Sequence, residues 1–243
     1  MKTICLCNSN IAWGGGEKWH LEAALALAGR GWRVLLLCHP KGALFARAPK
    51  DVPGLEVIPV PLGRLSFLNP FMRKRLRDIF RKARPRAVLL NMSTDLKSAG
   101  PAARAAGIPK IIFRRGLAEP VRDSALNRHL YGEVITHLIA NSEATLNMVL
   151  ANNSNLIPRE RVTVLYNGMD AGVFDKALAD AAAQLTEGGG GQTTDDGGKE
   201  VPGDGDSPAS ILRGLAAARL AGRERPLVIG TAGSLGQFRE RPK

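Results

Sequence analysis

Cysteines, aromatic side chains and long apolar runs are all scarce in this sequence. Its three cysteines are not joined by a further Cys or His pair at metal-ligand spacing, which argues against a disulfide framework and a zinc site. No apolar run has the length of a membrane-spanning helix, and the apolar stretch at the N-terminus is too short for a signal peptide. These absences predict a reduced, cytoplasmic protein with no metal and no cofactor.

Positive charge is abundant and unevenly distributed. The net charge is +12, yet residues 186–208 hold six acids and one base, so the rest of the chain carries +17. Such an excess predicts an anionic partner, namely a phosphorylated substrate, an acidic lipid or nucleic acid. Aromatic residues make up only 5% of the chain and no nucleic-acid motif is recognisable, so nucleic acid is the weakest of the three partners.

Short apolar runs alternate with stretches of helical periodicity along the first two thirds of the chain. The runs predict strands at Thr3–Cys7, Arg33–Cys38, Leu55–Val60, Ala87–Leu90, Lys110–Phe113, Val134–Ala140 and Val162–Tyr166. The intervening patterns predict helices at His20–Ala28, 70–84, Leu96–Ala106 and Glu143–Leu150. This alternation is typical of an α/β fold with a doubly wound, Rossmann-like parallel sheet.

A glycine-rich turn follows the first predicted strand. Gly14, Gly15 and Gly16 leave backbone N–H groups uncovered by side chains, and the helix that follows adds the positive end of its dipole. An anionic group could therefore approach this turn, although a tight connection without a ligand is an equal alternative. Glu17 could likewise be a first-turn carboxylate that the helix dipole favours.

Polar or glycine residues also follow four later strands. In doubly wound sheets, ligands bind outside the carboxyl ends of the strands, so these residues are expected to share one rim with the glycine turn. The further candidate binding residues are Asp95, Arg114, Arg115, Asn141, Ser142, Asn167 and Gly168. Asn141 and Ser142 would serve equally well as helix caps, and the two arginines could be solvated charges.

The helix expected at residues 70–84 is strongly basic. Its apolar stripe consists of Met72, Leu76, Ile79, Phe80 and Ala83, and arginine and lysine fill much of the remaining surface. A solvated face of a crossover helix is one interpretation, and an anionic membrane surface as partner is the other.

The composition changes beyond residue 175. Residues 176–225 are interpreted as a linker with an acidic insertion, because eight glycines and almost no apolar side chain lie between Gly188 and Gly205. Pro226–Ala232 then resembles one more buried strand. We therefore expect three segments: a Rossmann-like domain at 1–175, a disordered linker at 176–225, and the first strand of a truncated second domain at 226–243.

Several of these segments resemble family 4 glycosyltransferases. The resemblance lies in Gly14-Gly15-Gly16-Glu17, in Ala140-Asn141-Ser142-Glu143-Ala144-Thr145 and in Val164-Leu165-Tyr166-Asn167-Gly168-Met169-Asp170. Residues 228–235 are similar to the strand and turn that open the family's donor domain, and Lys243 lies near its phosphate-binding lysine. The resemblance covers about the whole chain except the acidic insertion.

The resemblance implies a retaining enzyme of GT-B fold, of which residues 1–175 are the acceptor-side domain. Such an enzyme would transfer a sugar from a nucleotide-sugar donor to a lipid-linked or phosphorylated saccharide, as in lipopolysaccharide or other cell-envelope synthesis, at the inner face of the cytoplasmic membrane. Arg114 and Arg115 replace the family's His-containing segment and suggest bidentate binding of an anionic acceptor.

The family's Glu-x7-Glu donor motif does not occur before Lys243, so the chain as given is expected to be inactive alone. The first alternative to a glycosyltransferase is a non-catalytic module that binds an acceptor or a membrane. The second alternative is a basic nucleic-acid-binding protein.

Overall fold

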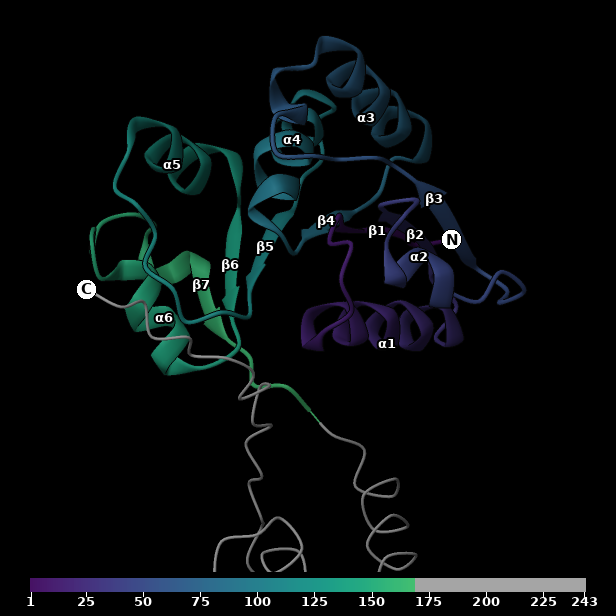
Figure 1. Cartoon of the computed structure of the whole chain (residues 1–243), viewed down its shortest axis with the longest axis horizontal. Helices are drawn as coiled ribbons and strands as arrows, with labels where there is room; N and C mark the ends of the chain where they lie inside the picture. The colour runs from purple at the N-terminus through teal and green to yellow at the C-terminus, as the bar shows by residue number, and fades with distance from the viewer. Residues whose placement is uncertain (169–243) are drawn as a thin grey trace, which may run out of the picture. The chain divides into compact units, whose positions relative to one another are not determined.

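A computed structural model describes residues 1–168, which carry the elements labelled in Figure 1. The strands are β1 (Thr3–Asn8), β2 (Arg33–Cys38), β3 (Leu55–Pro59), β4 (Ala87–Leu90), β5 (Ile111–Arg115), β6 (His137–Ala140) and β7 (Val162–Val164). The α-helices are α1 (Gly15–Gly29), α2 (Ala43–Arg47), α3 (Pro70–Ala83), α4 (Ser93–Ala105), α5 (Ala125–His129) and α6 (Glu143–Leu150). Three single turns of other helix types complete them: η1 (Ser66–Leu68), η2 (Leu130–Val134) and η3 (Arg159–Arg161).

The first compact unit of the chain spans Met1–Asn167. The linker expected at 176–225, the strand expected at 226–243 and the binding role expected of Lys243 all lie outside the described residues. The expected domain boundary at residue 175 also lies beyond them and stays a prediction.

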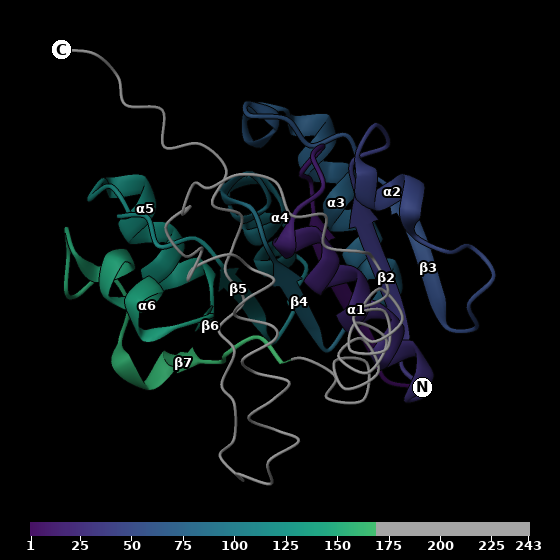
Figure 2. The same ribbon diagram turned by 60° about the horizontal axis from the view of Figure 1, so that its bottom comes forward.

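All seven strands form one parallel sheet in the order β3-β2-β1-β4-β5-β6-β7. Figure 2 shows β3 and β7 toward opposite edges of this sheet. The doubly wound α/β fold expected from the sequence is therefore confirmed. The strand order reverses between β1 and β4, and it is outside the carboxyl ends of strands at such a switch point that open α/β sheets bind their ligands.

Helices cover both faces of the sheet. Side chains on both faces of each strand are therefore buried, and the strands have continuous apolar sequences. Residues Val34–Cys38 of β2 are all buried, as parallel strands covered on both faces require. One core cluster joins Leu6 and Leu36 to Ala24 of α1 and Leu44 of α2. Figure 1 shows α1 on this side of the sheet and α3 and α4 on the other.

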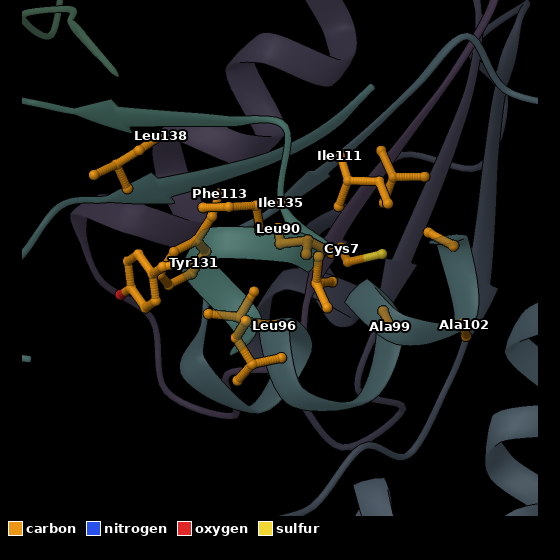
Figure 3. Packing of buried hydrophobic residues seen from close by; sticks show 14 of the residues in the cluster. Cys7, Leu90, Leu96, Ala99, Ala102, Ile111, Phe113, Tyr131, Ile135 and Leu138 are labelled. Carbon is orange, nitrogen blue, oxygen red and sulfur yellow. The ribbon is translucent and has the colours of Figure 1, made fainter. Parts of the chain in front are cut away.

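The second core cluster lies between the sheet and α3 and α4. Figure 3 shows Leu96 and Ala99 of α4 beside Cys7 and Leu90 of the sheet, and Tyr131 beside Phe113. The Phe113 and Tyr131 rings meet edge to face, with their centroids 5.8 Å apart. Cys5 and Cys7 share this face as buried, unpaired thiols, as the alternation of side chains along a strand predicts.

Several element boundaries differ from the sequence expectations, for local reasons. Helix α1 begins at Gly15, so the expected turn is in part the first turn of the helix. Helix α4 begins at Ser93, three residues early, because the Asp95 side chain accepts from the backbone of Met92 and caps it. Strand β6 begins only at His137, because Leu130–Val134 form a π-helical turn.

The sequence patterns did not predict the two shortest α-helices. Helices α2 and α5 have five residues each, which is too short for a helical period to show. Helix α3, in contrast, begins as expected: Pro70 is its first residue, and the Asn69 side chain accepts from the N–H groups of Phe71 and Met72 at 2.9 and 3.2 Å. Within residues 1–168, no helix is long and apolar enough to cross a membrane.

Phe80→Ala and Phe71→Ala form a matched pair that tests the packing of α3. Phe80 is fully buried whereas Phe71 is 81% exposed, on the same helix. We expect Phe80→Ala to lower the free energy of unfolding by about 3 to 5 kcal/mol and Phe71→Ala to change it by less than about 0.5 kcal/mol. Urea denaturation measures both, and equal losses would contradict the assigned face of α3.

Candidate functional site

Two asparagines stand side by side at the point where the strand order reverses. Asn8 ends β1, Asn91 follows β4, and the Asn91 N–H donates to the Cys7 carbonyl at 3.1 Å. Asn8 is fully buried, while Asn91 is only half-buried. Their placement is a result of the topology, since 82 residues of chain separate them.

The glycine turn presents unpaired backbone donors at this rim. Gly14 caps α1 without a side-chain bond, and the first helical bond runs from Lys18 N–H to the Gly14 carbonyl at 3.0 Å. No acceptor from residues 1–168 meets the N–H groups of Gly15, Gly16 and Glu17. A side chain at 16 would put its Cβ 3.0 Å from Asn91 Nδ2, so the Asn91 side chain would have to shift by a few tenths of an ångström to admit it.

Glu17 lies beneath this turn. Its side chain is 3% exposed, and its Oε1 accepts from Asn8 Nδ2 at 3.2 Å. The Asn8 Oδ1 accepts from the Asn10 N–H at 3.1 Å, so Asn8 links the Glu17 carboxylate to the loop between β1 and α1. Glu17 is therefore more than a surface carboxylate at a helix start, because it is buried and bonded inside the fold.

Asp95 joins the two strand-to-helix turns of the switch point. Its fully buried carboxylate accepts from the Ser9 N–H at 3.1 Å and from the Met92 N–H at 2.8 Å. Burial raises the pKa of Asp95 to about 6, although the hydrogen bonds from Ser9 and Met92 act in the opposite direction. Because its oxygens are used inside the protein, Asp95 shapes the rim instead of facing a ligand.

Arg114 reaches across the rim from β5. Its side chain is 3% exposed, with the guanidinium 4.3 Å over the Trp19 ring. Nη2 donates to Asn167 Oδ1 at 2.9 Å, and Nη1 donates to Asn91 Oδ1 at 3.4 Å. Burial lowers the pKa of Arg114 to about 10 and Glu17 opposes this shift, so the guanidinium stays charged at neutral pH.

Arg115 does not form a pair with Arg114. Strand β5 extends through both residues, and successive side chains of a strand point to opposite faces. Arg114 therefore lies against α1, whereas Arg115 Nη2 donates to the Glu119 carbonyl at 2.9 Å. The two arginines therefore do not act as one pair, and the anion-binding role expected of them stays a prediction.

Two rim residues had no role assigned from the sequence: Trp19 and His20. His20 is fully buried, and its Nδ1 lies 3.1 Å from the Gly16 carbonyl, so Nδ1 carries the proton and Nε2 is left as a buried acceptor without a partner in residues 1–168. Burial, together with the nearby charge of Arg114, lowers the pKa of His20 to about 3. The available signal was helical spacing, since His20 follows Gly16 by four residues.

The remaining expected site residues lie at the β5, β6 and β7 ends. Ser142 caps α6 by accepting from the Thr145 N–H at 3.1 Å, as one of its two interpretations predicted. Asn141 donates to the Gly116 carbonyl at 3.1 Å and so ties two loops together. Asn167 contacts Arg114, and Gly168 is the last described residue.

The rim is therefore assembled from most of the expected residues, together with Trp19 and His20. Asn8 bonds to Glu17, Arg114 bonds to Asn91 and Asn167, and Asp95 bonds to Ser9 and Met92, while Asn141 and Ser142 belong to the next strand end. Within residues 1–168, no group of three or more His, Cys, Asp or Glu side chains could hold a metal ion. What the rim offers a ligand is backbone N–H donors and positive charge, which suit an anion.

Arg114→Lys tests whether the planar guanidinium is required. Lysine keeps the charge but cannot both stack on Trp19 and bond to two asparagines, so we expect the free energy of unfolding to fall by roughly 2 to 3 kcal/mol. Arg115→Lys is the control and should cost less than about 1 kcal/mol, since it loses one bond to a carbonyl. Denaturant titration of both variants gives the comparison, and equal costs would contradict the geometry.

His20 makes stability depend on pH. Its folded pKa, about 3, lies below its unfolded value, so the unfolded chain alone gains a proton as the pH falls from about 6.5 toward 3, and stability is lost. We expect the parent to lose about 2 kcal/mol more than His20→Gln between pH 7 and pH 5. The contribution of Asp95 has the opposite sign, because its raised pKa makes stability fall as the pH rises from about 4 to 6.

Urea unfolding at the two pH values measures the difference for His20→Gln. Asp95→Asn is the companion variant, and its removal should change the pH dependence in the opposite direction. An unchanged pH dependence in His20→Gln would show that the imidazole is accessible to protons in the folded protein.

A family model described as Glycosyltransferase Family 4 matches residues 13–173. A search of curated proteins found no match.

Solved structures share the fold at low sequence identity. A glycosyltransferase from Rickettsia africae aligns with a TM-score of 0.61 and 17% identity over 76% of this chain and 49% of its own. Anabaena HepE in complex with UDP-glucose aligns with a TM-score of 0.55 and 18% identity over 76% and 50%. The lipopolysaccharide outer core galactosyltransferase WaaB aligns with a TM-score of 0.51 and 14% identity over 70% and 46%.

The chain spans about half the length of these structures, which have the GT-B fold, and its described residues supply one Rossmann-like sheet. The resemblance drawn from the glycine turn and the later strand ends is thereby confirmed at the level of the family. From residue 13 to residue 173, which includes the glycine turn and the later strand ends of the rim, this chain belongs to glycosyltransferase family 4.

Proposed function

We propose that this protein is the acceptor-side part of a retaining GT-B glycosyltransferase. It would serve the transfer of a sugar from a nucleotide-sugar donor to a lipid-linked or phosphorylated saccharide. The observation that carries this proposal is the set of free N–H groups at the start of α1, placed at the switch point of the sheet. HepE, which has the same fold, was crystallised with UDP-glucose, and this supports a nucleotide sugar as the donor.

The rim residues have distinct roles in this proposal. Transfer from a nucleotide sugar leaves a diphosphate on which negative charge develops, and preorganised donors stabilise such charge. The N–H groups of Gly15 and Gly16 and the positive end of α1 would meet an anionic group of donor or acceptor. Asn141, Ser142 and Gly168 would border the saccharide, and Lys243 would contact phosphate.

Arg114 would contribute positive potential without direct contact. Its nitrogens are bonded to Asn91 and Asn167, and its side chain is 3% exposed, so it has little surface for a ligand. The low-dielectric surroundings strengthen its field at the rim. Arg115, which is partly exposed at the end of β5, would instead help to hold an anionic acceptor at the loop that follows.

We further propose that the enzyme works on cell-envelope saccharides at the inner face of the cytoplasmic membrane. The fold that it shares with WaaB, a lipopolysaccharide outer core galactosyltransferase, supports this setting. The basic surface of α3 supports it independently, since seven arginines and lysines lie at residues 73–84.

Gly16→Ala and Gly15→Ala test the proposed anion site as a matched pair. An added methyl at position 16 would press on Asn91 Nδ2, 3.0 Å away, whereas nothing lies within 4 Å of the Cβ position at residue 15. We expect Gly16→Ala to weaken binding of a phosphorylated saccharide by roughly tenfold, the scale of one charge-assisted hydrogen bond. Gly15→Ala should bind within about twofold of the parent.

Calorimetric titration of the protein with a phosphorylated saccharide, and separately with a UDP-sugar, provides the measurement. The dephosphorylated saccharide is the ligand control, because it keeps the sugar and removes the charge. Equal binding of the two saccharides, or equal effects of the two alanine variants, would refute the rim as the anion site. The absence of binding to either ligand in the parent would refute the proposed function.

A further inference from the structure

Three large apolar side chains lie exposed around the start of α3. Leu65 and Leu68 are each 65% exposed and Phe71 is 81% exposed, and they occur within seven residues. Leu65 precedes η1, Leu68 ends it, and Phe71 is the second residue of α3. Single exposed apolar side chains are common, but a group of three in one short segment marks an interaction surface.

Basic side chains continue the same surface along α3. Arg73, Lys74, Arg75, Arg81 and Lys82 are all exposed. Asp78 is the only acid of the helix, and its carboxylate is paired with Lys74 at 2.8 Å. The helix therefore combines an apolar N-terminal end with a positively charged body, which is the composition of a segment that lies on an anionic bilayer.

A small hollow between α3 and α4 is lined by the same basic side chains. Its volume is about 160 Å³, with Arg73, Lys74 and Arg77 on the α3 side and Pro101, Ala102 and Ala105 on the α4 side. None of these residues is acidic. The three basic side chains of the lining therefore give the hollow a positive charge that would favour an anion.

The surface also lies on the correct side of the sheet to serve the rim. Helix α3 connects β3 to β4, which run parallel. It therefore begins near the carboxyl ends of the strands and ends near their amino ends. Leu65, Leu68 and Phe71 are therefore at the same end of the fold as Asn91. Figure 1 shows α3 and α4 together on one side of the sheet, opposite α1.

We propose that residues 65–82 dock on an anionic phospholipid bilayer. Leu65, Leu68 and Phe71 enter the interface, the exposed lysines and arginines lie against the headgroups, and the hollow at Arg77 takes one phosphate group. This inference rests on the proposed function for its purpose, which is to bring the rim to an acceptor held in the membrane. Its physical basis is independent, because it needs neither donor nor sugar transfer.

Two other occupants fit the surface less well. A second copy of this chain would bring two strongly basic helices together, and like charges across an interface are costly. Nucleic acid would satisfy the basic side chains and could stack a base on Phe71, but it would leave Leu65 and Leu68 in water. An anionic bilayer uses both the charge and the apolar group.

Vesicle co-sedimentation of the full chain tests the proposal. We expect binding to vesicles that contain 30% phosphatidylglycerol, little binding to pure phosphatidylcholine, and a decline as salt is raised from about 0.05 to 0.5 M. The variant Arg73→Gln/Lys74→Gln/Arg77→Gln should bind about a hundredfold more weakly, because each basic side chain near such a surface contributes roughly fivefold. The control Arg30→Gln/Lys50→Gln/Lys110→Gln removes the same charge from exposed positions elsewhere and should retain most of the binding.

The apolar contribution is tested separately. Leu65→Ser/Leu68→Ser/Phe71→Ser leaves every charge in place and should reduce vesicle binding at least tenfold, with an unchanged thermal midpoint. Phe71→Trp should show a blue shift of its added tryptophan fluorescence when vesicles are present. Millimolar inorganic phosphate should not displace the protein if the bilayer is the partner, whereas full displacement would show a free-anion site and overturn the docking surface.

Other results would also overturn the proposal. Equal losses in the two glutamine triples would mean that only net charge matters. Unchanged binding in the serine triple would mean that the apolar group is not a membrane contact. A dimer that becomes monomeric with Phe71→Ser, without vesicle binding in the parent, would assign the surface to a second copy. Vesicle binding without any saccharide or nucleotide binding would support this surface and refute the proposed function, so the two are distinguishable.

Discussion

The buried carboxylate of Asp95 ties together the two strand-to-helix turns on which the whole rim is built. It accepts from Ser9 after β1 and from Met92 before α4, and these two segments meet only because the strand order reverses between β1 and β4. Two backbone N–H groups at a buried position need an acceptor, and a carboxylate can serve both. The cost is visible in the raised pKa of Asp95, about 6, which comes from burial. The shape of the rim therefore depends on a side chain that itself offers nothing to a ligand.

A second layer of interactions connects this switch point to the end of the sheet. Arg114 stacks on Trp19 of α1 and donates to Asn167 after β7, so one side chain spans the first helix and the last strand. Its charge also contributes to the low pKa of the buried His20, about 3, which leaves the imidazole neutral. Neutral His20 and charged Arg114 can then lie close together without mutual repulsion. The glycine turn is thus supported from below by a set of buried polar groups, while its N–H groups stay free above.

The apolar and basic surface of α3 is separate from the rim but begins at the same end of the sheet. A parallel sheet places the start of every crossover helix at the carboxyl ends of its strands, which is where ligands bind. Membrane contact near the start of α3 and saccharide binding at the rim would therefore face the same direction. This arrangement is a consequence of the fold itself, and it gives a reason for Phe71 and Leu68 to stay exposed instead of joining the core beside Phe80.

The sequence by itself determined the fold class and most of the rim. Continuous apolar runs such as Val34–Leu37 predicted strands buried on both faces, and their alternation with helices predicted the doubly wound sheet. The same rule placed Gly14–Glu17, Asp95 and Asn167 at strand ends, and the order of the motifs was enough to indicate the family. Local patterns predict these features because the spacing of apolar residues along the sequence depends on which side chains of a strand or helix are buried.

Only the tertiary structure decided what each rim residue does. Asp95 and Glu17 face inward, Arg114 is bonded to Asn91 and Asn167, and Arg115 lies on the other face of the sheet. His20, which has no distinctive sequence context, is buried beside Arg114. These outcomes depend on contacts between residues up to 95 positions apart, as for Trp19 and Arg114, and on whether β5 ends before or after Arg114. Arg114 and Arg115 point to opposite faces because β5 extends through both of them, and no local pattern in the sequence fixes a strand end that closely.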